Sequence, residues 1–262
     1  QSAYGDWETC VAEHILRAVN VRMTYREKGQ NAGDNALQSH RRMGFAYIEA
    51  LCKKLEEYEK QRDKYPTLES FFPELISVFK QLSEANLGPE FYEIPFFGTI
   101  NAVVTDKKAT VLIAPSNESD QAVQDSLCRH IQRIHDRYYT ESQILTDTVA
   151  LKTDLSTNSI VIYGTAKGNL WLAQLMPKLP VRIESDRIVA DSVYSGTNLR
   201  LIMVWPNPQN QSKGVVIYTA QQAKDIMGIN GVFHGPTDYV VARNSEVLKA
   251  GDYIKKGATW TF

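Results

Sequence analysis

The chain has 262 residues, of which 43% are hydrophobic and 23% charged, a balance typical of globular domains and not of disordered chains. Its formal net charge of −1 gives no electrostatic support for nucleic acid or an anionic membrane surface as the main partner. The apolar runs are far shorter than the roughly twenty residues that a membrane-spanning helix needs.

The N-terminal part of the chain has the pattern of successive helices. In residues 6–27, apolar side chains recur at steps of three and four, which indicates one buried helical stripe. The sequence KGQNAGDN, with two glycines, then predicts a break. A second helix is expected over about residues 36–64. A third begins near Thr67 or Ser70 and stops at the sequence NLGPE.

In the remainder of the chain, short apolar runs alternate with amphipathic helices, which is typical of a mostly parallel sheet covered on both faces. The expected strands are residues 110–115, 159–164, 199–208, 214–220 and 238–243. The expected helices are residues 119–139, 169–179 and 221–228. Ser119 or Asp120 is a suitable N-cap for the first of these helices. Residues 180–205 predict a hairpin or another antiparallel element.

These patterns predict an α+β chain in two parts. An all-α helical lobe is expected over residues 1–95 and an α/β three-layer domain over residues 100–262, with the boundary within residues 93–108. The second part is expected to have a Rossmann- or flavodoxin-like, mostly parallel sheet. Three widely spaced cysteines predict small buried apolar groups and not a disulfide framework. They are Cys10, Cys52 and Cys128.

Glu13 and His14 stand side by side in the first expected helix. Glu13 falls on the polar side, one turn before Arg17, which favours an ion pair; His14 lies at the margin of the apolar stripe. A glutamate on a helix can also complete a His₂Glu zinc site. However, the sequence contains no HExxH, and His130 and His135 point about 140° apart on a helix. The residues alone therefore favour an ordinary amphipathic helix.

The sequence VIYGTAKGNLWL, residues 161–172, has the strand–loop–helix arrangement that can hold phosphate at a helix N-terminus. Its spacing fits neither GxGxxG nor GxxxxGK[ST], and a plain β–α turn explains the glycines equally well. The loop still follows a strand at the edge where open α/β sheets bind ligands. The candidate ligand-binding residues are Gly164, Lys167, Gly168 and Asn169.

The sequence VFHGPTDY places His234 and Asp238 in a loop before the last strand, which suggests a hydrolase dyad. No GxSxG elbow supplies a nucleophile, and the serines Ser116 and Ser195 have no motif around them. The structural alternative is a loop in which Asp238 accepts backbone hydrogen bonds and His234 packs. In VWPNPQN, Trp205 can line a groove or serve packing alone.

Five stretches together resemble the C-terminal portion of an uncharacterised family of bacterial, gluzincin-like zinc metallopeptidases. They are YGDWETCVAEHILRAV, YEKQRDKYPTLESFFPEL, VIYGTAKGN, VWPNP and FHGPTDYVVAR. The resemblance implies an HExxH helix upstream of Gln1, Glu13 as the third zinc ligand, and Tyr4 and Arg17 near the site. It also implies a peptide or protein substrate and an exported or periplasmic protein. Without the HExxH helix, no zinc and no catalysis are expected of this chain alone.

Three interpretations follow. The leading one is a C-terminal fragment of a zinc-dependent, metallopeptidase-like hydrolase. The first alternative is a non-enzymatic α/β module that binds a ligand or partner at the loops 164–169 and 232–238. The second is a small-molecule hydrolase that uses His234 and Asp238.

Overall fold

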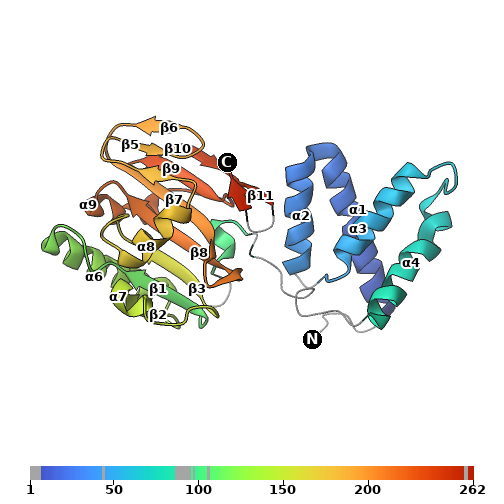
Figure 1. Cartoon of the computed structure of the whole chain (residues 1–262), viewed down its shortest axis with the longest axis horizontal. Helices are drawn as coiled ribbons and strands as arrows, with labels where there is room; N and C mark the ends of the chain where they lie inside the picture. Colours follow the sequence, from blue (N-terminus) through green and yellow to red (C-terminus); the bar gives the residue numbers. More distant parts are fainter. Residues whose placement is uncertain (1–6, 43–44, 86–95, 97, 105–106, 257–258) are drawn as a thin grey trace. The chain divides into compact units, whose positions relative to one another are not determined.

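The computed structural model describes residues 7–42, 45–85, 96, 98–104, 107–256 and 259–262 (Figure 1). Its contacts divide the chain into two compact units, residues 1–97 and 98–262. The first unit is built from helices, and the second contains a seven-stranded sheet. In the described part of the chain, every helix is too short or too polar to cross a membrane.

The helical unit packs its helices round one apolar core. Its helices are α1 (Trp7–Lys28), α2 (Gln30–Arg42), α3 (Ile48–Lys60) and α4 (Leu68–Glu84). The most deeply buried side chains are Ala18, Val21, Ile48, Leu51 and Leu75. The start of α4 is as predicted, because Thr67 Oγ1 accepts a hydrogen bond of 3.2 Å from Ser70 N in a capping box.

The predicted break and second helix of this unit are wrong in their bounds. Gly29 has a φ of +83°, the left-handed conformation that ends a helix, and α2 begins at the next residue. Gly33 lies inside α2, where a Cβ atom would come within 2.0 Å of the Tyr25 ring. Glycine is thus needed there for close packing and not for a loop. The helix expected over residues 36–64 is two helices, because the chain turns and buries Phe45 between them.

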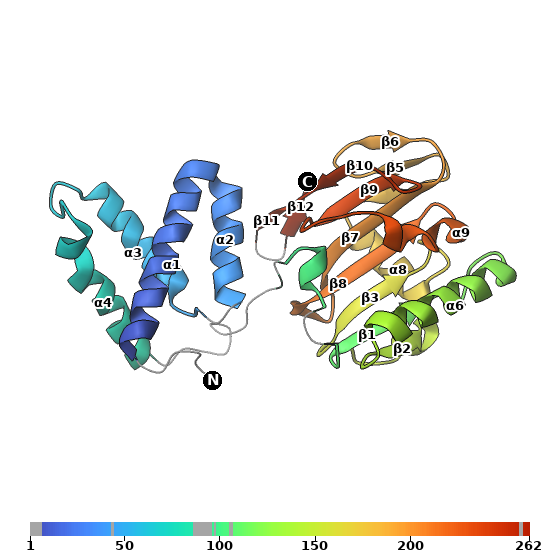
Figure 2. The same cartoon turned by 180° about the vertical axis from the view of Figure 1, so that it is seen from behind.

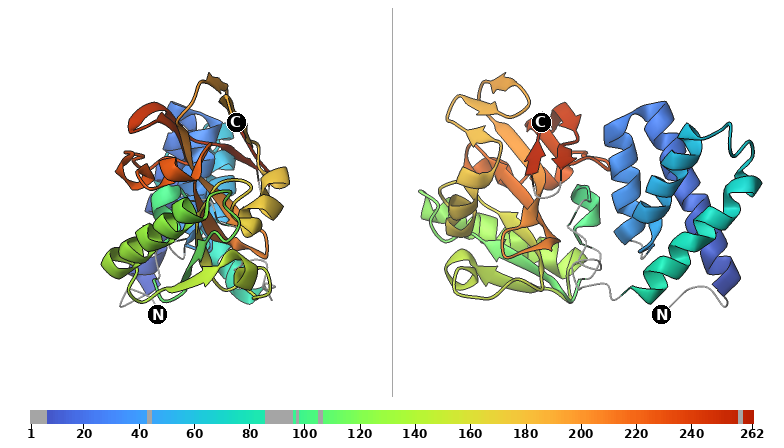
Figure 3. Two further views of the ribbon diagram at one scale, coloured as in Figure 1. Left: turned by 90° about the vertical axis from the view of Figure 1, so that its left-hand side faces the viewer. Right: turned by 45° about the vertical axis from the view of Figure 1, so that its right-hand side comes forward.

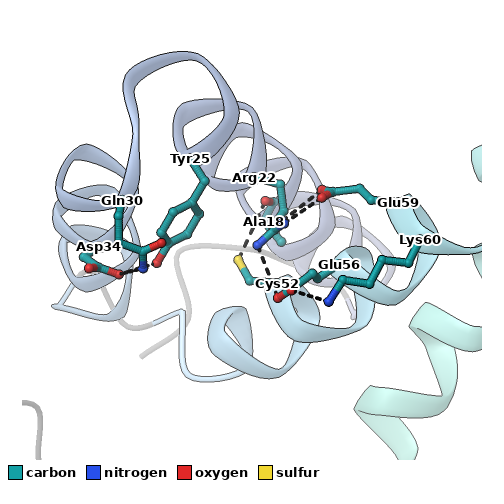
Figure 4. A network of polar contacts seen from close by, with 9 residues as sticks. All are labelled: Ala18, Arg22, Tyr25, Gln30, Asp34, Cys52, Glu56, Glu59 and Lys60. Atoms are coloured by element: carbon teal, nitrogen blue, oxygen red, sulfur yellow. Dashed lines mark hydrogen bonds and ion pairs between the residues drawn. The ribbon is translucent and has the colours of Figure 1, made fainter.

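The contact between α1 and α3 is apolar inside and polar at its rim (Figure 4). Arg22 donates hydrogen bonds of 2.9 and 2.6 Å to the two carboxylate oxygens of Glu59. Deeper in the contact, Cys52 Sγ lies 3.7 Å from Ala18 O, and burial raises the pKa of the thiol to about 12. The cysteines are free thiols; Cys52 is buried as predicted, whereas Cys10 and Cys128 are only half-buried.

The α/β unit is built on a mixed sheet with the strand order β10-β9-β7-β8-β3-β1-β2. The strands are β1 (Thr110–Ala114), β2 (Gln143–Thr146), β3 (Ser159–Tyr163), β7 (Leu199–Asn207), β8 (Asn210–Ala220), β9 (Tyr239–Arg243) and β10 (Glu246–Gly251). The neighbours β2, β1, β3 and β8 are parallel, whereas β7, β9 and β10 add antiparallel pairs. The five predicted strands are confirmed; β2 and β10 were not predicted.

Helices cover both faces of this sheet. They are α6 (Gln121–Tyr138), α7 (Asp147–Ala150), α8 (Leu170–Leu175) and α9 (Ala223–Ile226). Short 3₁₀ turns are η1 (Ile100–Ala102), η2 (Met176–Lys178) and η3 (Ile229–Gly231). The helix α8 lies in front of the sheet in Figure 1, whereas α6 lies in front in the reverse view of Figure 2. As predicted, Asp120 caps α6 by accepting hydrogen bonds from the backbone amides of Ala122 and Val123.

Two small antiparallel sheets accompany the main one. The strands β4 (Arg182–Ile183), β5 (Arg187–Val189) and β6 (Val193–Ser195) confirm the predicted antiparallel element (Figure 3). Gln221, directly after β8, donates hydrogen bonds of 3.0 Å to Glu184 O and to Gly196 O. This side chain holds the small sheet at the end of β8. The strands β11 (Ile254–Lys256) and β12 (Thr259–Thr261) form a hairpin.

A buried ion pair anchors this last hairpin. Lys255 Nζ lies 2.7 Å from Asp238 Oδ1, and the two side chains are 2% and 1% exposed. Tyr253 N donates to the other oxygen of Asp238 at 2.9 Å. Desolvation raises the pKa of Asp238, and the nearby Lys255 ammonium opposes that shift. Trp260 lies over the ammonium, and Trp205 packs edge-on to Trp260, so Trp205 belongs to this aromatic cluster.

Candidate functional site

A cleft of about 570 Å³ lies at the carboxyl ends of the parallel strands β1, β3 and β8. Its walls come from residues 117–120, 165–168, 183–185 and 220–224. The chain leaves β1 toward β2 on one side and returns to β3 on the other, so the strand order reverses between β1 and β3. Open α/β sheets bind ligands at such a point, because the loops on either side diverge there.

One wall of the cleft is a turn held by a glutamate from the neighbouring strand end. Glu118 Oε1 accepts from Thr165 N at 2.7 Å, and its Oε2 accepts from Thr165 Oγ1 at 2.7 Å. Gly168 N in turn donates to Thr165 Oγ1 at 2.9 Å. A Cβ atom on Gly168 would lie 1.9 Å from the carboxylate carbon of Glu118, so this position has no space for a side chain. The glycine therefore makes the approach of Glu118 possible.

The start of α8 is held by a second carboxylate, that of the buried residue Asp147. Its Oδ2 accepts from Leu170 N at 2.6 Å and from Ser116 N at 3.2 Å. Asn169 caps the same helix by accepting from Leu172 N at 3.0 Å. The amides of Thr165, Gly168 and Leu170 therefore already donate to side chains of the chain, and these three are not free to hold a phosphate.

The remaining cleft surface carries charges of both signs. Lys167 and Lys224 are exposed and line it, together with the carboxylates of Glu118, Asp120 and Glu184. A carboxylate has about four acceptor positions, of which the Thr165 bonds use only two at Glu118. The cleft thus offers hydrogen-bond acceptors beside two exposed ammonium groups.

The proposed dyad of His234 and Asp238 is not formed. His234 lines a different cavity, where its Nδ1 lies 3.1 Å from Gly235 O. Asp238 is 1% exposed and binds Lys255 and a backbone amide, as its structural alternative predicted. Asp238 lies directly before β9, and its carboxylate points into the core. The spacing of residues along the sequence does not predict this direction. The candidate loops 164–169 and 232–238 therefore contribute to different places and not to one site.

In the helical unit, Glu13 forms the predicted ion pair, with its Oε1 2.6 Å from Arg17 Nη2. Arg17 Nη1 lies 3.1 Å from His40 Nδ1, and the guanidinium lies 4.3 Å from the centre of the Phe45 ring. Among the described residues, no group of three or more His, Cys, Asp and Glu side chains is placed to hold a metal. Tyr4 lies outside the described residues.

His14 belongs to the core of the same unit. It is 6% exposed, its Nδ1 lies 2.8 Å from Cys10 O, and its ring packs edge-on to Phe45 and Phe79. Burial lowers the pKa of His14 below its usual value, and the nearby Arg17 lowers it further. This placement confirms the predicted hydrogen-bonded residue at the margin of the apolar stripe.

Comparison with known proteins concerns the helical unit alone. The model of a family described as a domain of unknown function (DUF4932) matches residues 1–78. That stretch includes α1, α2, α3 and the first part of α4. None of the curated proteins matches the chain.

The burial of His14 predicts acid sensitivity of the helical unit. Its folded pKa is lowered, so the unfolded state binds the proton more readily, and stability falls as pH drops through the unfolded value of about 6.5. His40, whose pKa is also lowered by burial, adds to this effect. We expect His14→Leu to reduce the loss of unfolding free energy between about pH 7.5 and about pH 5.5. Urea titrations followed by circular dichroism measure it.

His135, in α6 of the α/β unit, provides a contrast, because its hydrogen bond with Asp136 raises its pKa and the effect on the stability of that unit has the opposite sign. The contribution of His135 to the free energy of unfolding is present at low pH and is lost as pH rises. His135→Leu is therefore expected to increase the loss of unfolding free energy as pH falls. If the unfolding free energy depended on pH equally in His14→Leu and in the parent protein, the buried His14 would not be the cause of the acid sensitivity.

Proposed function

We propose that the α/β unit is a binding module that holds a small zwitterionic ligand, such as a short peptide, in the cleft at its carboxyl edge. The observation that carries this proposal is a cleft of about 570 Å³ lined by both carboxylates and lysines. Its volume is within the range of roughly 300–1,000 Å³ typical of small-molecule sites. Its position at the reversal of strand order also favours ligand binding.

The charges of the cleft favour a zwitterion over a phosphate. The backbone amides of Thr165 and Leu170, which an anion could otherwise use, already donate to Glu118 and Asp147. A ligand ammonium group has acceptors in Glu118 and Asp120, and a ligand carboxylate has Lys167 and Lys224. Both ends of an unblocked peptide therefore have partners of opposite charge.

The strand order supports a flavodoxin-like assignment of the parallel half of the sheet. The parallel neighbours follow the order β2-β1-β3-β8, which corresponds to the first four positions of the flavodoxin-like order 2-1-3-4-5. The antiparallel strands β7, β9 and β10 extend this core on one side. We propose on this ground that the unit is a Rossmann- or flavodoxin-like variant.

The peptide proposal is tested by NMR titration of the full chain with alanyl-alanine, N-acetyl-alanyl-alanine and alanyl-alanine amide. We expect alanyl-alanine to shift the amide signals of residues 117–120 and 165–168 saturably, and each blocked analogue to bind more weakly. Lys167→Met removes the partner of the ligand carboxylate. It should weaken alanyl-alanine about fivefold, while the amide analogue is unaffected.

Lys178→Met is the control, because Lys178 is exposed and lies outside the cleft. It should leave all three affinities unchanged. Unsaturable shifts, equal affinity for all three ligands, or an equal effect of both lysine substitutions would overturn the proposal.

A second proposal is that the helical unit supplies Glu13 to a zinc site of a metallopeptidase-like hydrolase completed by an HExxH helix. The observation that favours it is a part-exposed carboxylate in a fixed position: Glu13 is 27% exposed and Arg17 holds it. Arg17 is itself held by His40 and by the face of Phe45. Zinc bound by two histidines and a glutamate keeps an open position for water, which it activates.

This second proposal is tested on the longest natural reading frame that contains the chain. We expect that protein to carry an HExxH sequence and to bind zinc, and Glu13→Ala to weaken zinc binding at least tenfold. Glu49→Ala is the control, because Glu49 is also a part-exposed carboxylate with cationic partners. A reading frame without HExxH, or equal zinc affinity in both variants, excludes Glu13 as a ligand.

A further inference from the structure

A second cavity, of about 510 Å³, lies over one face of the main sheet and is separate from the carboxyl-edge cleft. Val161 of β3 and Val216 of β8, which are paired neighbours, contribute to its apolar wall. The C-terminal turn of α6 and the turn η1 form further walls. The cavity therefore sits on an apolar part of the sheet between helical segments.

Aromatic rings are the largest side chains of this cavity. Tyr138 and Tyr139 come from the end of α6, and Tyr218 comes from β8. Tyr218 stacks on Tyr163 with ring centres 4.7 Å apart and planes inclined by 7°. The Tyr163 hydroxyl accepts a 2.9 Å hydrogen bond from Asn230 Nδ2, which fixes the stacked pair. Rings held in this way favour a flat, apolar ligand group.

Polar groups at the cavity are also held in place. The Oδ1 atom of Asn230 lies 3.0 Å from His130 Nε2, and its Nδ2 atom carries a second hydrogen beyond the one donated to Tyr163. Asn101 Nδ2 donates to Gly235 O at 2.9 Å. His234 Nδ1 lies 3.1 Å from the same carbonyl, so Nδ1 carries the proton and Nε2 is an acceptor in the neutral ring. The cavity thus combines an apolar floor with a few oriented polar atoms.

The charge at the cavity is positive. Lys107 lines it with an exposed side chain, and the described residues that line it include no aspartate or glutamate. The backbone of Lys107 is held in place, because Lys107 O accepts from Ser142 Oγ at 2.7 Å and from Thr110 N at 3.2 Å. A ligand carboxylate has an ammonium partner there, with the Asn230 amide as a further donor.

From these contacts we infer that the cavity is a second binding site, for a small aromatic carboxylic acid. The ring of the ligand lies against Tyr138, Tyr139 and Tyr218, and its carboxylate faces Lys107. This site goes beyond the proposed peptide cleft, and the two sites share none of their lining residues.

Calorimetric titration of the full chain with indole-3-acetate, indole-3-acetamide and acetate tests this inference. We expect both indoles to bind, the charged one more tightly, and acetate not to bind. Lys107→Met should weaken indole-3-acetate about fivefold and leave indole-3-acetamide unchanged. Tyr138→Ala should weaken both indoles about fivefold, because each loses a ring contact; Tyr138 is 48% exposed, so the fold tolerates its removal.

Lys108→Met is the matched control. Lys108 is the next residue, is paired with Glu141 at 3.6 Å and is outside the cavity lining. Lys108→Met should leave the affinities for both indoles unchanged. Lys167→Met, in the carboxyl-edge cleft, should also leave these two affinities unchanged. No binding of either indole overturns the inference, and so does an equal effect of Lys107→Met on both indoles. A loss of indole binding in Lys167→Met overturns it as well, because the ring would then lie in the other cleft.

Discussion

The architecture of the carboxyl edge depends on the need of part-buried backbone amides for acceptors. Asp147, which follows β2, binds Ser116 N after β1 and Leu170 N after β3. One buried carboxylate thus connects the ends of three neighbouring parallel strands. Glu118 satisfies the adjacent turn in the same way through Thr165. Because amides without a partner are costly where water is excluded, these two side chains fix the shape of the cleft.

The α/β unit consequently separates two kinds of surface. The cleft at the carboxyl edge is lined by charged side chains of both signs. The cavity on the sheet face has apolar side chains of the sheet as its floor, with tyrosines, amide side chains and one lysine around them. In the helical unit, the group of interest is the ion pair of Glu13 and Arg17. The family match covers residues 1–78, so it supports a recurring helical segment and leaves the α/β unit to be assigned from its own geometry.

The sequence predicted the elements whose burial produces a clear pattern. The fully buried strand β1 and the amphipathic helix α6 are at their expected places, whereas β2 is half-exposed and lacks an apolar run. Gly33 was taken for a break, because sequence does not distinguish a glycine needed for packing. The glycines Gly164 and Gly168 correctly marked the edge, but Asp147, which accepts from Leu170 N there, follows the unpredicted strand β2. The second cavity was missed because residues far apart, from Asn101 to His234, form it.

The central claim, that the chain's own carboxylates satisfy the amides of the carboxyl edge, is tested most directly by amide hydrogen exchange. The Leu170 amide, 2.6 Å from Asp147 Oδ2, should exchange slowly in the parent protein and at least roughly tenfold faster in Asp147→Asn. Amides within β3 should keep their protection in both proteins. Unchanged exchange at Leu170 in the variant, or protection of this amide in the parent protein only when inorganic phosphate is added, would contradict the account.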